Sequence, residues 1–141
     1  MRYLLDTNVL SEIRKADADQ RVVTWLRQQS ALDFAISVLS FGEIQRGASL
    51  LARGARRTAI ERRLTVDLPH QFAGRIIPID GAVAREWGRL SADGQRRGNV
   101  LPAMDGFLLA TAAVHGLAFV TRNTHRCEDC GIAVVDPWTA A

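Results

Sequence analysis

Three carboxylates stand at points of the chain from which they could act together on a divalent cation. Asp6 follows an apolar run, and Glu43 and Asp105 each lie near the start of a predicted helix. Carboxylates that share a pocket repel one another, and they persist there when a hard cation binds them through oxygen. A carboxylate-bound Mg²⁺ lowers the pKa of a water molecule and neutralises phosphoryl charge, so these residues could support phosphodiester hydrolysis.

The same residues also have purely structural explanations. Asp6 could cap the helix that follows it, and Asp105 could offset the dipole of its own helix. Ser40 and Glu43 fit a capping box, in which the Glu43 side chain reaches back to the Ser40 backbone. Asn123 suits a turn or an N-cap. The pattern alone therefore leaves both interpretations open.

Strands alternate with helices through most of the chain. The expected strands span residues 3–5, 34–37, 75–80, 117–120 and 132–135. The expected helices span residues 8–15, 19–29, 81–97 and 102–115, and a long helical region starts at 40, hinges near Gly54 and ends before Pro69. The strands are solidly apolar, as in sheets that helices cover on both faces. We therefore expect a single α/β domain over residues 1–141, a three-layer α/β/α sandwich with a mainly parallel sheet of about five strands.

The carboxyl ends of the strands are the expected place for a ligand site in an open parallel sheet. Asp6 follows the first expected strand, and residues 121–123 follow the fourth. Asp80 ends the third, in which Pro78 suggests a sheet edge or a strand end. The helix that carries Asp105 leads into the fourth strand from the opposite end of the sheet. Spacing alone therefore does not place Asp105 at this edge.

The composition limits the class of protein. The chain is 48% hydrophobic and 23% charged, which is typical of a globular domain. Its longest apolar stretch, around residues 107–120, is interrupted by His115 and Gly116, so no membrane span is expected. Asp6 breaks the N-terminal apolar run that a secretion signal would need, and two cysteines cannot form a disulfide framework. A cytoplasmic location is therefore expected.

The basic residues are almost all arginine. Lys15 is the only lysine among 18 basic residues, and the net charge is +3. Arginine suits bidentate phosphate binding, although a GC-rich genome also favours it. Arginines concentrate in residues 53–63, with Arg46 extending the stretch, which is either a solvated helical face or a rim for RNA or an acidic partner. An apolar groove beside it could be lined by Leu50, Leu51, Ile60 and Leu64.

Two further motifs suggest no chemistry. Cys127 and Cys130 form a C-x-x-C pair, but a structural zinc site needs four ligands and only His125 lies nearby. We therefore interpret them as incidental surface cysteines. No glycine-rich phosphate loop follows a strand, so no nucleotide cofactor is expected.

Five segments together resemble the PIN-domain family. They are residues 4–12 (Leu-Leu-Asp-Thr-Asn-Val-Leu-Ser-Glu), 40–43, 102–106, 120–123 and 136–138. Their order and spacing cover the chain end to end and are similar to those of VapC-type ribonuclease toxins and related FitB-type subunits. The resemblance implies an acidic cluster that binds Mg²⁺ or Mn²⁺ and hydrolyses RNA. It thus implies an endoribonuclease toxin of a type II toxin–antitoxin pair.

The family motifs assign roles to residues of this chain. The implied metal ligands are Asp6, Glu43 and Asp105. Asn123 would take the fourth catalytic position, which is often Asp in PIN domains, and its neutral amide weakens the case for a tightly held second metal ion. The implied flanking residues, which would support the site or face the substrate, are Asn8, Thr121 and Arg122.

The resemblance also implies partners. A VapB-like antitoxin would dock on the arginine-rich helical pair, and the chain would form a homodimer or a larger hetero-oligomer with it, reaching DNA only through the antitoxin. The alternative is a FitB-like subunit that acts mainly in a DNA-binding hetero-complex with little nuclease activity. A receiver-like domain with Asp6 as phosphoacceptor is disfavoured, because no lysine follows a late strand. An RNA cleavage assay separates the first two.

Overall fold

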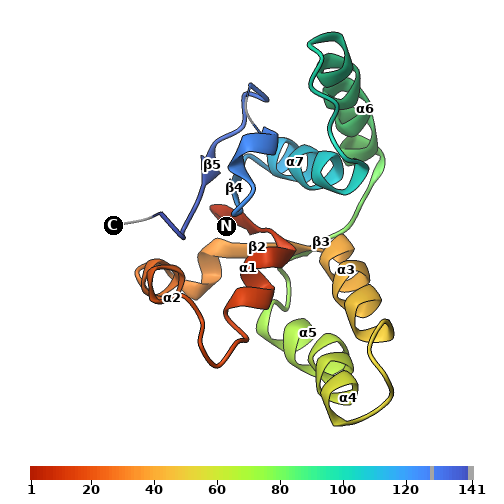
Figure 1. Cartoon of the computed structure of the whole chain (residues 1–141). Coiled ribbons are helices and arrows are strands. Elements are labelled where there is room, and N and C mark those ends of the chain that lie inside the picture. The colour runs from red at the N-terminus through yellow and green to blue at the C-terminus, as the bar shows by residue number, and fades with distance from the viewer. Residues whose placement is uncertain (128, 140–141) are drawn as a thin grey trace.

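A parallel sheet forms the centre of the computed structural model, which describes residues 1–127 and 129–139 (Figure 1). Its strands are β1 (Tyr3–Leu5), β2 (Phe34–Ser37), β3 (Ile76–Ile77), β4 (Ala118–Val120) and β5 (Val134–Val135). Their order is β3-β2-β1-β4-β5, and every neighbouring pair is parallel. The expected five-stranded parallel sheet is confirmed, with β3 at an edge as Pro78 suggested.

Helices cover both faces of the sheet. They are α1 (Thr7–Glu12), α2 (Gln20–Arg27), α3 (Val38–Ser49), α4 (Ala55–Arg62), α5 (Leu68–Gln71), α6 (Gly81–Arg96) and α7 (Ala103–His115). Two 3-10 turns, η1 (Ala31–Asp33) and η3 (Thr124–Cys127), and the π-helical turn η2 (Arg63–Asp67) complete the described elements. In this part of the chain, no helix is long and apolar enough to cross a membrane.

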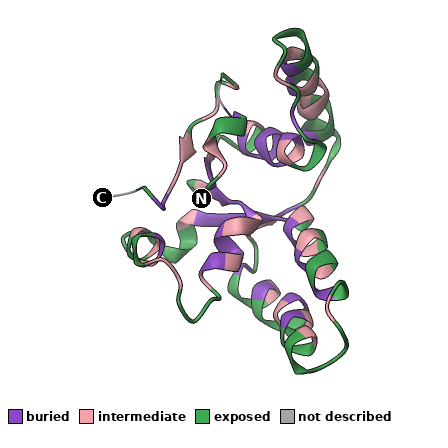
Figure 2. Cartoon of the chain, viewed as in Figure 1, coloured by how far each residue is buried: buried purple, intermediate pink, exposed green. Residues whose placement is uncertain are grey.

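Alternation along the strands divides the core into two clusters, one on each face. Leu5 and Val120 face the cluster built on α1 to α5, whereas Leu4 and Phe119 face the cluster built on α6 and α7. Strands β1, β2 and β4 are largely buried, whereas β5 is only partly buried, and the outer sides of the helices are exposed (Figure 2). Two buried faces require covering helices on both, so the three-layer α/β/α sandwich is confirmed.

Three expected helix boundaries are wrong. Helix α1 ends at Glu12 rather than at Lys15. Helix α3 begins at Val38, because the Ser37 side chain accepts from the Leu39 N–H and caps it. Ser40 therefore lies inside the helix, and the capping box that offered a structural explanation of Glu43 does not form. The helical region also runs on through Pro69, which occupies the first turn of α5 after the wider π-helical turn η2. Proline is tolerated there because a first-turn residue needs no N–H donor.

The direction of α7 decides where Asp105 lies. The helix runs antiparallel to β4, so its C-terminus feeds the amino end of that strand and its first turn lies at the carboxyl edge of the sheet (Figure 1). Helix α6 supports this turn, since the Trp87 ring stacks on Phe107 with centroids 4.8 Å apart. The direction of α7 therefore places Asp105 at the carboxyl edge of the sheet, which spacing in the sequence could not show.

Candidate active site at the carboxyl edge of the sheet

Asp6 lies at the junction of β1 and β4. Leu5 pairs with Val120 in the sheet, and the Asp6 N–H donates to the Val120 carbonyl at 2.9 Å. The buried carboxylate of Asp6 accepts from the Thr7 N–H at 2.6 Å through Oδ1, and from the Thr121 hydroxyl at 2.7 Å through Oδ2. Asp6 therefore does cap α1, as its structural explanation held, and its second oxygen is fixed by a residue from another strand.

Glu43 reaches the same region from α3. Its Oε1 accepts from the Thr7 hydroxyl at 2.6 Å, and the Thr7 hydroxyl also lies 2.9 Å from the hydroxyl of the buried Ser40. Thr7 follows Asp6 in the chain, so one hydroxyl connects α3 to the end of β1. Glu43 therefore turns toward Thr7 beside Asp6 rather than back to the Ser40 backbone.

Asp105 joins the site from the first turn of α7. Its carboxylate is 15% exposed, and its Oδ2 accepts from the Arg126 guanidinium at 3.0 Å. Arg126 belongs to η3, the turn that follows β4. Sequence reasoning overlooked Arg126, because a lone arginine in an irregular segment carries no spacing signal.

The flanking residues form a network around Thr121, which is buried. Its Oγ1 accepts from the Asn8 amide at 3.3 Å and from the Asn123 N–H at 3.1 Å while it donates to Asp6. The Arg122 guanidinium lies 5.3 Å from the centroid of the Trp138 ring, in cation–π contact. Thr121 thus orients the acidic edge from behind, and Arg122 lies at its rim.

The electrostatics of Asp6 reflect this crowding. Burial raises the pKa of the Asp6 carboxyl from 3.8 to about 6, and the negative charges of Glu43 and Asp105 add to the rise. Hydrogen bonds from Thr121 and Thr7 act in the opposite direction. The three carboxylates therefore interact, as side chains of one pocket must.

These side chains line one open pocket of about 440 Å³. It is bordered by Asp6, Asn8, Glu43, Asp105 and Asn123, together with Thr7, Ser11, Glu12, Lys15, Arg122, Arg126 and Trp138. Asp80 lies elsewhere, where it caps α6 by accepting from the Val83 N–H. The pocket thus brings together the residues to which the sequence assigned a role in the site, except Thr121, which does not line it but donates to Asp6.

The chemistry of the donors suits a hard divalent cation. The pocket offers carboxylate and amide oxygens, and the buried Oδ1 of Asn8 has no hydrogen-bond partner among the described residues. Within that same part of the chain, no three His, Cys, Asp or Glu side chains stand close enough to form a ready ligand cluster. Mg²⁺ needs only one or two carboxylates, with water and substrate oxygens for the rest, so the residues fit a partly hydrated cation.

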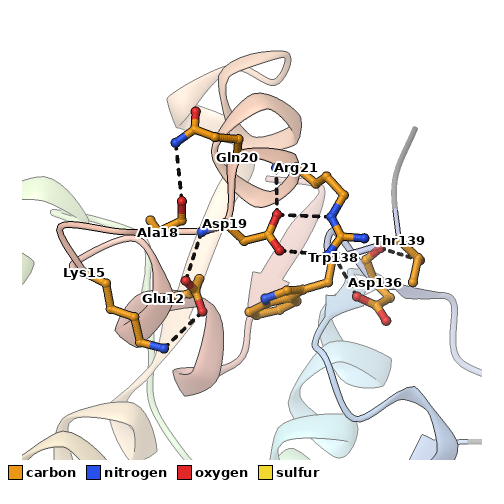
Figure 3. A network of polar contacts seen from close by, with 9 residues as sticks. All are labelled: Glu12, Lys15, Ala18, Asp19, Gln20, Arg21, Asp136, Trp138 and Thr139. Carbon is orange, nitrogen blue, oxygen red and sulfur yellow. Dashed lines mark hydrogen bonds and ion pairs between the residues drawn. The ribbon is translucent and has the colours of Figure 1, made fainter.

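Glu12, Lys15 and Trp138 border the pocket, and they lie near the start of α2 and the C-terminal segment (Figure 3). Buried Glu12 accepts from the Asp19 N–H at 3.0 Å and from the Lys15 ammonium at 3.3 Å. Asp19 caps α2, and its hydrogen bonds from Arg21 lower its pKa to about 2. Lys15 is therefore kept beside the acidic pocket by Glu12, where it can meet an anionic substrate.

The family is decided by a match that spans most of the fold. The model of the family described as "PIN domain" matches residues 3–128. The chain belongs to the PIN-domain family. The pocket described above lies almost wholly within the matched range, with Trp138 outside it.

This PIN domain is similar to characterised relatives over nearly its whole length. It is 34% identical over 138 residues to the VapC ribonuclease Y4jK of Sinorhizobium fredii, with 98% of this chain and 99% of that protein covered. It is 35% identical over 135 residues to the toxin FitB of Neisseria gonorrhoeae, covering 96% and 97%. A solved structure of FitAB bound to an IR36 DNA fragment matches with a TM-score of 0.91 at 32% identity, covering 99% and 97%.

The structure corrects the expected apolar groove of this PIN domain. Ile60 and Leu64 are buried in the core, whereas Leu50 is largely exposed, so the four residues do not line one open groove. Arg63 is also not part of a rim, because its guanidinium donates to the Leu10 carbonyl at 3.0 Å, and burial lowers its pKa. The exposed arginines of the stretch are Arg46, Arg53, Arg56 and Arg62.

The description of Cys127 as a surface cysteine is also wrong. Its side chain is buried, and burial raises the pKa of the thiol to about 12. The thiol lies 3.7 Å from the Asn123 carbonyl, which it can meet as a weak donor. Cys127 therefore packs as an apolar residue in the cluster on the α6 and α7 face and holds η3 against it, a role that the C-x-x-C spacing does not indicate.

Proposed function

We propose that this PIN domain is the toxin of a type II toxin–antitoxin pair and a metal-dependent endoribonuclease. The observation that carries the proposal is that Asp6, Glu43 and Asp105, from three separate segments, line one pocket with a cationic rim. The relatives named VapC ribonuclease and toxin FitB support it, since they match almost the whole chain.

The residues of the pocket have different roles in the proposed hydrolysis. In this proposal Asp6, Glu43 and Asp105 hold the cation, with the Asn123 amide oxygen at the fourth position. A bound Mg²⁺ or Mn²⁺ supplies a water of lowered pKa and neutralises phosphoryl charge. Thr7 and Thr121 fix the Asp6 carboxylate by hydrogen bonds, so that its oxygens are oriented before the cation arrives.

The rim supplies the positive charge that an RNA substrate requires. Lys15, Arg122 and Arg126 border the same pocket as the carboxylates. Phosphate contacts by such side chains give affinity that falls as the salt concentration rises. The neutral Asn123 removes one negative charge from the site, which favours a single tightly held cation over two.

The partner proposed for this chain is a VapB-like antitoxin. Structural neighbours include FitAB bound to DNA and the complex FitAcB of Neisseria gonorrhoeae, at 32% and 34% identity. The exposed arginines of α4 offer an acidic segment of the antitoxin a charged surface, and DNA would be reached only through the antitoxin. The homodimer and the cytoplasmic location belong to the same proposal.

A second candidate function is a FitB-like subunit with little nuclease activity, which acts mainly in a DNA-binding hetero-complex. Two observations favour it. The fourth position of the acidic site is Asn123 rather than an acid, and the FitAB–DNA structure covers 99% of this chain. The intact Asp6, Glu43 and Asp105 favour the nuclease instead.

An RNA cleavage assay on the purified full chain separates the two candidates. Cleavage that needs Mg²⁺ or Mn²⁺, is abolished by EDTA and is lost in Asp6→Asn and Asp105→Asn is the expected result. Asp80→Asn is the matched control, because Asp80 also follows a strand and caps a helix but lies outside the pocket. Failure of the wild-type chain to cleave RNA with either metal would favour the second candidate.

A further inference from the structure

The contact between Arg126 and Asp105 differs from the other ion pairs of the described residues. The others join residues two to four positions apart, such as Lys15 with Glu12. The Arg126–Asp105 pair spans 21 positions and joins η3 to α7. An ion pair that connects distant segments is not a by-product of helical spacing, and this one lies at the wall of the acidic pocket.

The Arg126 guanidinium offsets part of the negative charge of the pocket. Three carboxylates line that pocket, and the charges of Glu43 and Asp105 contribute to the raised pKa of Asp6. A cation at Asp105 relieves this repulsion, whether the cation is a guanidinium or a metal ion. Arg126 contacts Asp105 through Oδ2, one of the two oxygens with which Asp105 could bind a metal.

We propose that Arg126 is a built-in counter-ion of the acidic pocket, which a divalent cation must displace from Asp105 in order to bind. The inference rests on the proposed metal site and adds a determinant of its affinity. Arg126 thereby sets the metal concentration at which the pocket fills. The Arg126 guanidinium and the divalent cation therefore compete for the Asp105 carboxylate.

The structure shows how the guanidinium can leave and stay near. The Arg126 side chain is 46% exposed, so it can swing into solvent. Its backbone is held, because the Arg126 N–H donates to the Asn123 carbonyl at 3.2 Å and the next residue, Cys127, is buried. The displaced Arg126 side chain therefore stays near the rim of the pocket, and it can pair with Asp105 again when the cation dissociates.

The test is a Mn²⁺ titration of the metal-free full chain, followed by the electron paramagnetic resonance signal of free Mn²⁺. We expect Arg126→Ala to bind Mn²⁺ about two- to fivefold more tightly than the wild type, since a partly exposed ion pair no longer opposes binding. Arg126→Gln, which keeps the stem of the side chain, should shift affinity in the same direction. Thermal unfolding checks that each variant is folded.

Arg122→Ala is the matched control, because Arg122 borders the same pocket but contacts Trp138 rather than a carboxylate. Its loss removes the same charge from the rim and should change Mn²⁺ affinity by less than about twofold, because screening weakens exposed charges. Equal affinity in wild type, Arg126→Ala and Arg126→Gln would overturn this inference alone. An equal gain in Arg122→Ala would also overturn it. Absence of Mn²⁺ binding in every form would overturn the proposed metal site as well.

Discussion

The Thr121 hydroxyl donates to Oδ2 of Asp6 at 2.7 Å, although 115 positions separate the two residues. Each is the residue that follows a central strand, and β1 and β4 pair in register at Leu5 and Val120. The register therefore places the two side chains together at the edge of the sheet. This hydrogen bond also lowers the pKa of the Asp6 carboxyl, and it therefore favours the charged form.

Thr121→Val should weaken both the fold and the site. The substitution keeps the shape but leaves the Asn8 amide and the Asn123 N–H without their acceptor, which we expect to lower the free energy of unfolding by about 1–3 kcal/mol. Loss of the hydrogen bond to Asp6 also removes a contact that lowers its pKa. Urea unfolding and the rate of RNA cleavage measure the two effects.

Thr111→Val is the control for this substitution. Thr111 is equally buried, but its hydroxyl donates to the Phe107 carbonyl within α7 and not to a carboxylate of the pocket. Its replacement should lower the free energy of unfolding by less than about 1 kcal/mol and leave cleavage unchanged. Equal losses of cleavage in both variants would show that the Thr121 bond has no special role.

The stability of the metal-free protein should fall as pH rises through the range in which Asp6 titrates. The pKa of Asp6 is raised from 3.8 to about 6 on folding. Between these values the unfolded chain has released its proton while the folded chain keeps it, so the free energy of unfolding decreases with pH. The decrease from this group is complete above pH 6 and amounts to about 1–3 kcal/mol.

Asp6→Asn should remove this component, because its side chain has no charge to bury. Urea unfolding in EDTA at several pH values between 4 and 8 measures the difference between variant and wild type. The variant should gain stability over the wild type as pH rises to 6 and keep that gain above it. A difference that stays constant across this range would contradict the raised pKa.

Gly106→Ala should disturb the first turn of α7. A Cβ at Gly106 would lie 2.9 Å from Cδ1 of Trp87, which packs against this turn. Overpacking of this kind is expected to lower the free energy of unfolding by about 1–3 kcal/mol, and displacement of the neighbouring Asp105 should slow cleavage. Gly88→Ala is the control, since a Cβ there meets nothing within 4 Å and should stabilise α6 by about 0.5–1 kcal/mol. Chemical denaturation compares them, and a stable, fully active Gly106→Ala would contradict the expected clash.

Reversal of charge at the start of α4 and just before it should weaken binding of the antitoxin. Arg53→Glu combined with Arg56→Glu changes two exposed arginines, and the effect should be larger at low salt because surface charges are screened. Either change alone should matter little, since exposed ion pairs contribute about 0–1 kcal/mol. Co-purification with the cognate antitoxin at two salt concentrations measures the loss.

The control for the arginine pair is Arg85→Glu with Arg96→Glu, which makes the same change of charge on α6, across the sheet from α4 (Figure 1). This control should retain the antitoxin at both salt concentrations. If the α4 variant retains it equally well, the arginine stretch is only a solvated helical face.

The sequence by itself determined the class of fold and most of the candidate residues. Continuously apolar strands that alternate with helices require a sheet covered by helices on both faces. This requirement does not depend on how individual side chains pack. Asp6 and Thr121 follow strands directly, so strand-end placement was readable from local order. Helix boundaries were less certain, since Ser37 rather than Ser40 caps α3 and Pro69 is tolerated after a π-helical turn.

Only the tertiary structure decided which polar groups meet. Asp105 joins Asp6 because α7 returns antiparallel to β4, a matter of chain direction that spacing does not express. Arg126 and Thr7 enter the site through contacts with residues 21 and 36 positions away. Cys127 is buried and Arg63 is half-buried by packing that the sequence of their own segments does not indicate. Local sequence patterns reflect the backbone preferences of the residues and the spacing of the apolar ones. A hydrogen bond or ion pair between distant segments depends instead on how the helices and strands pack.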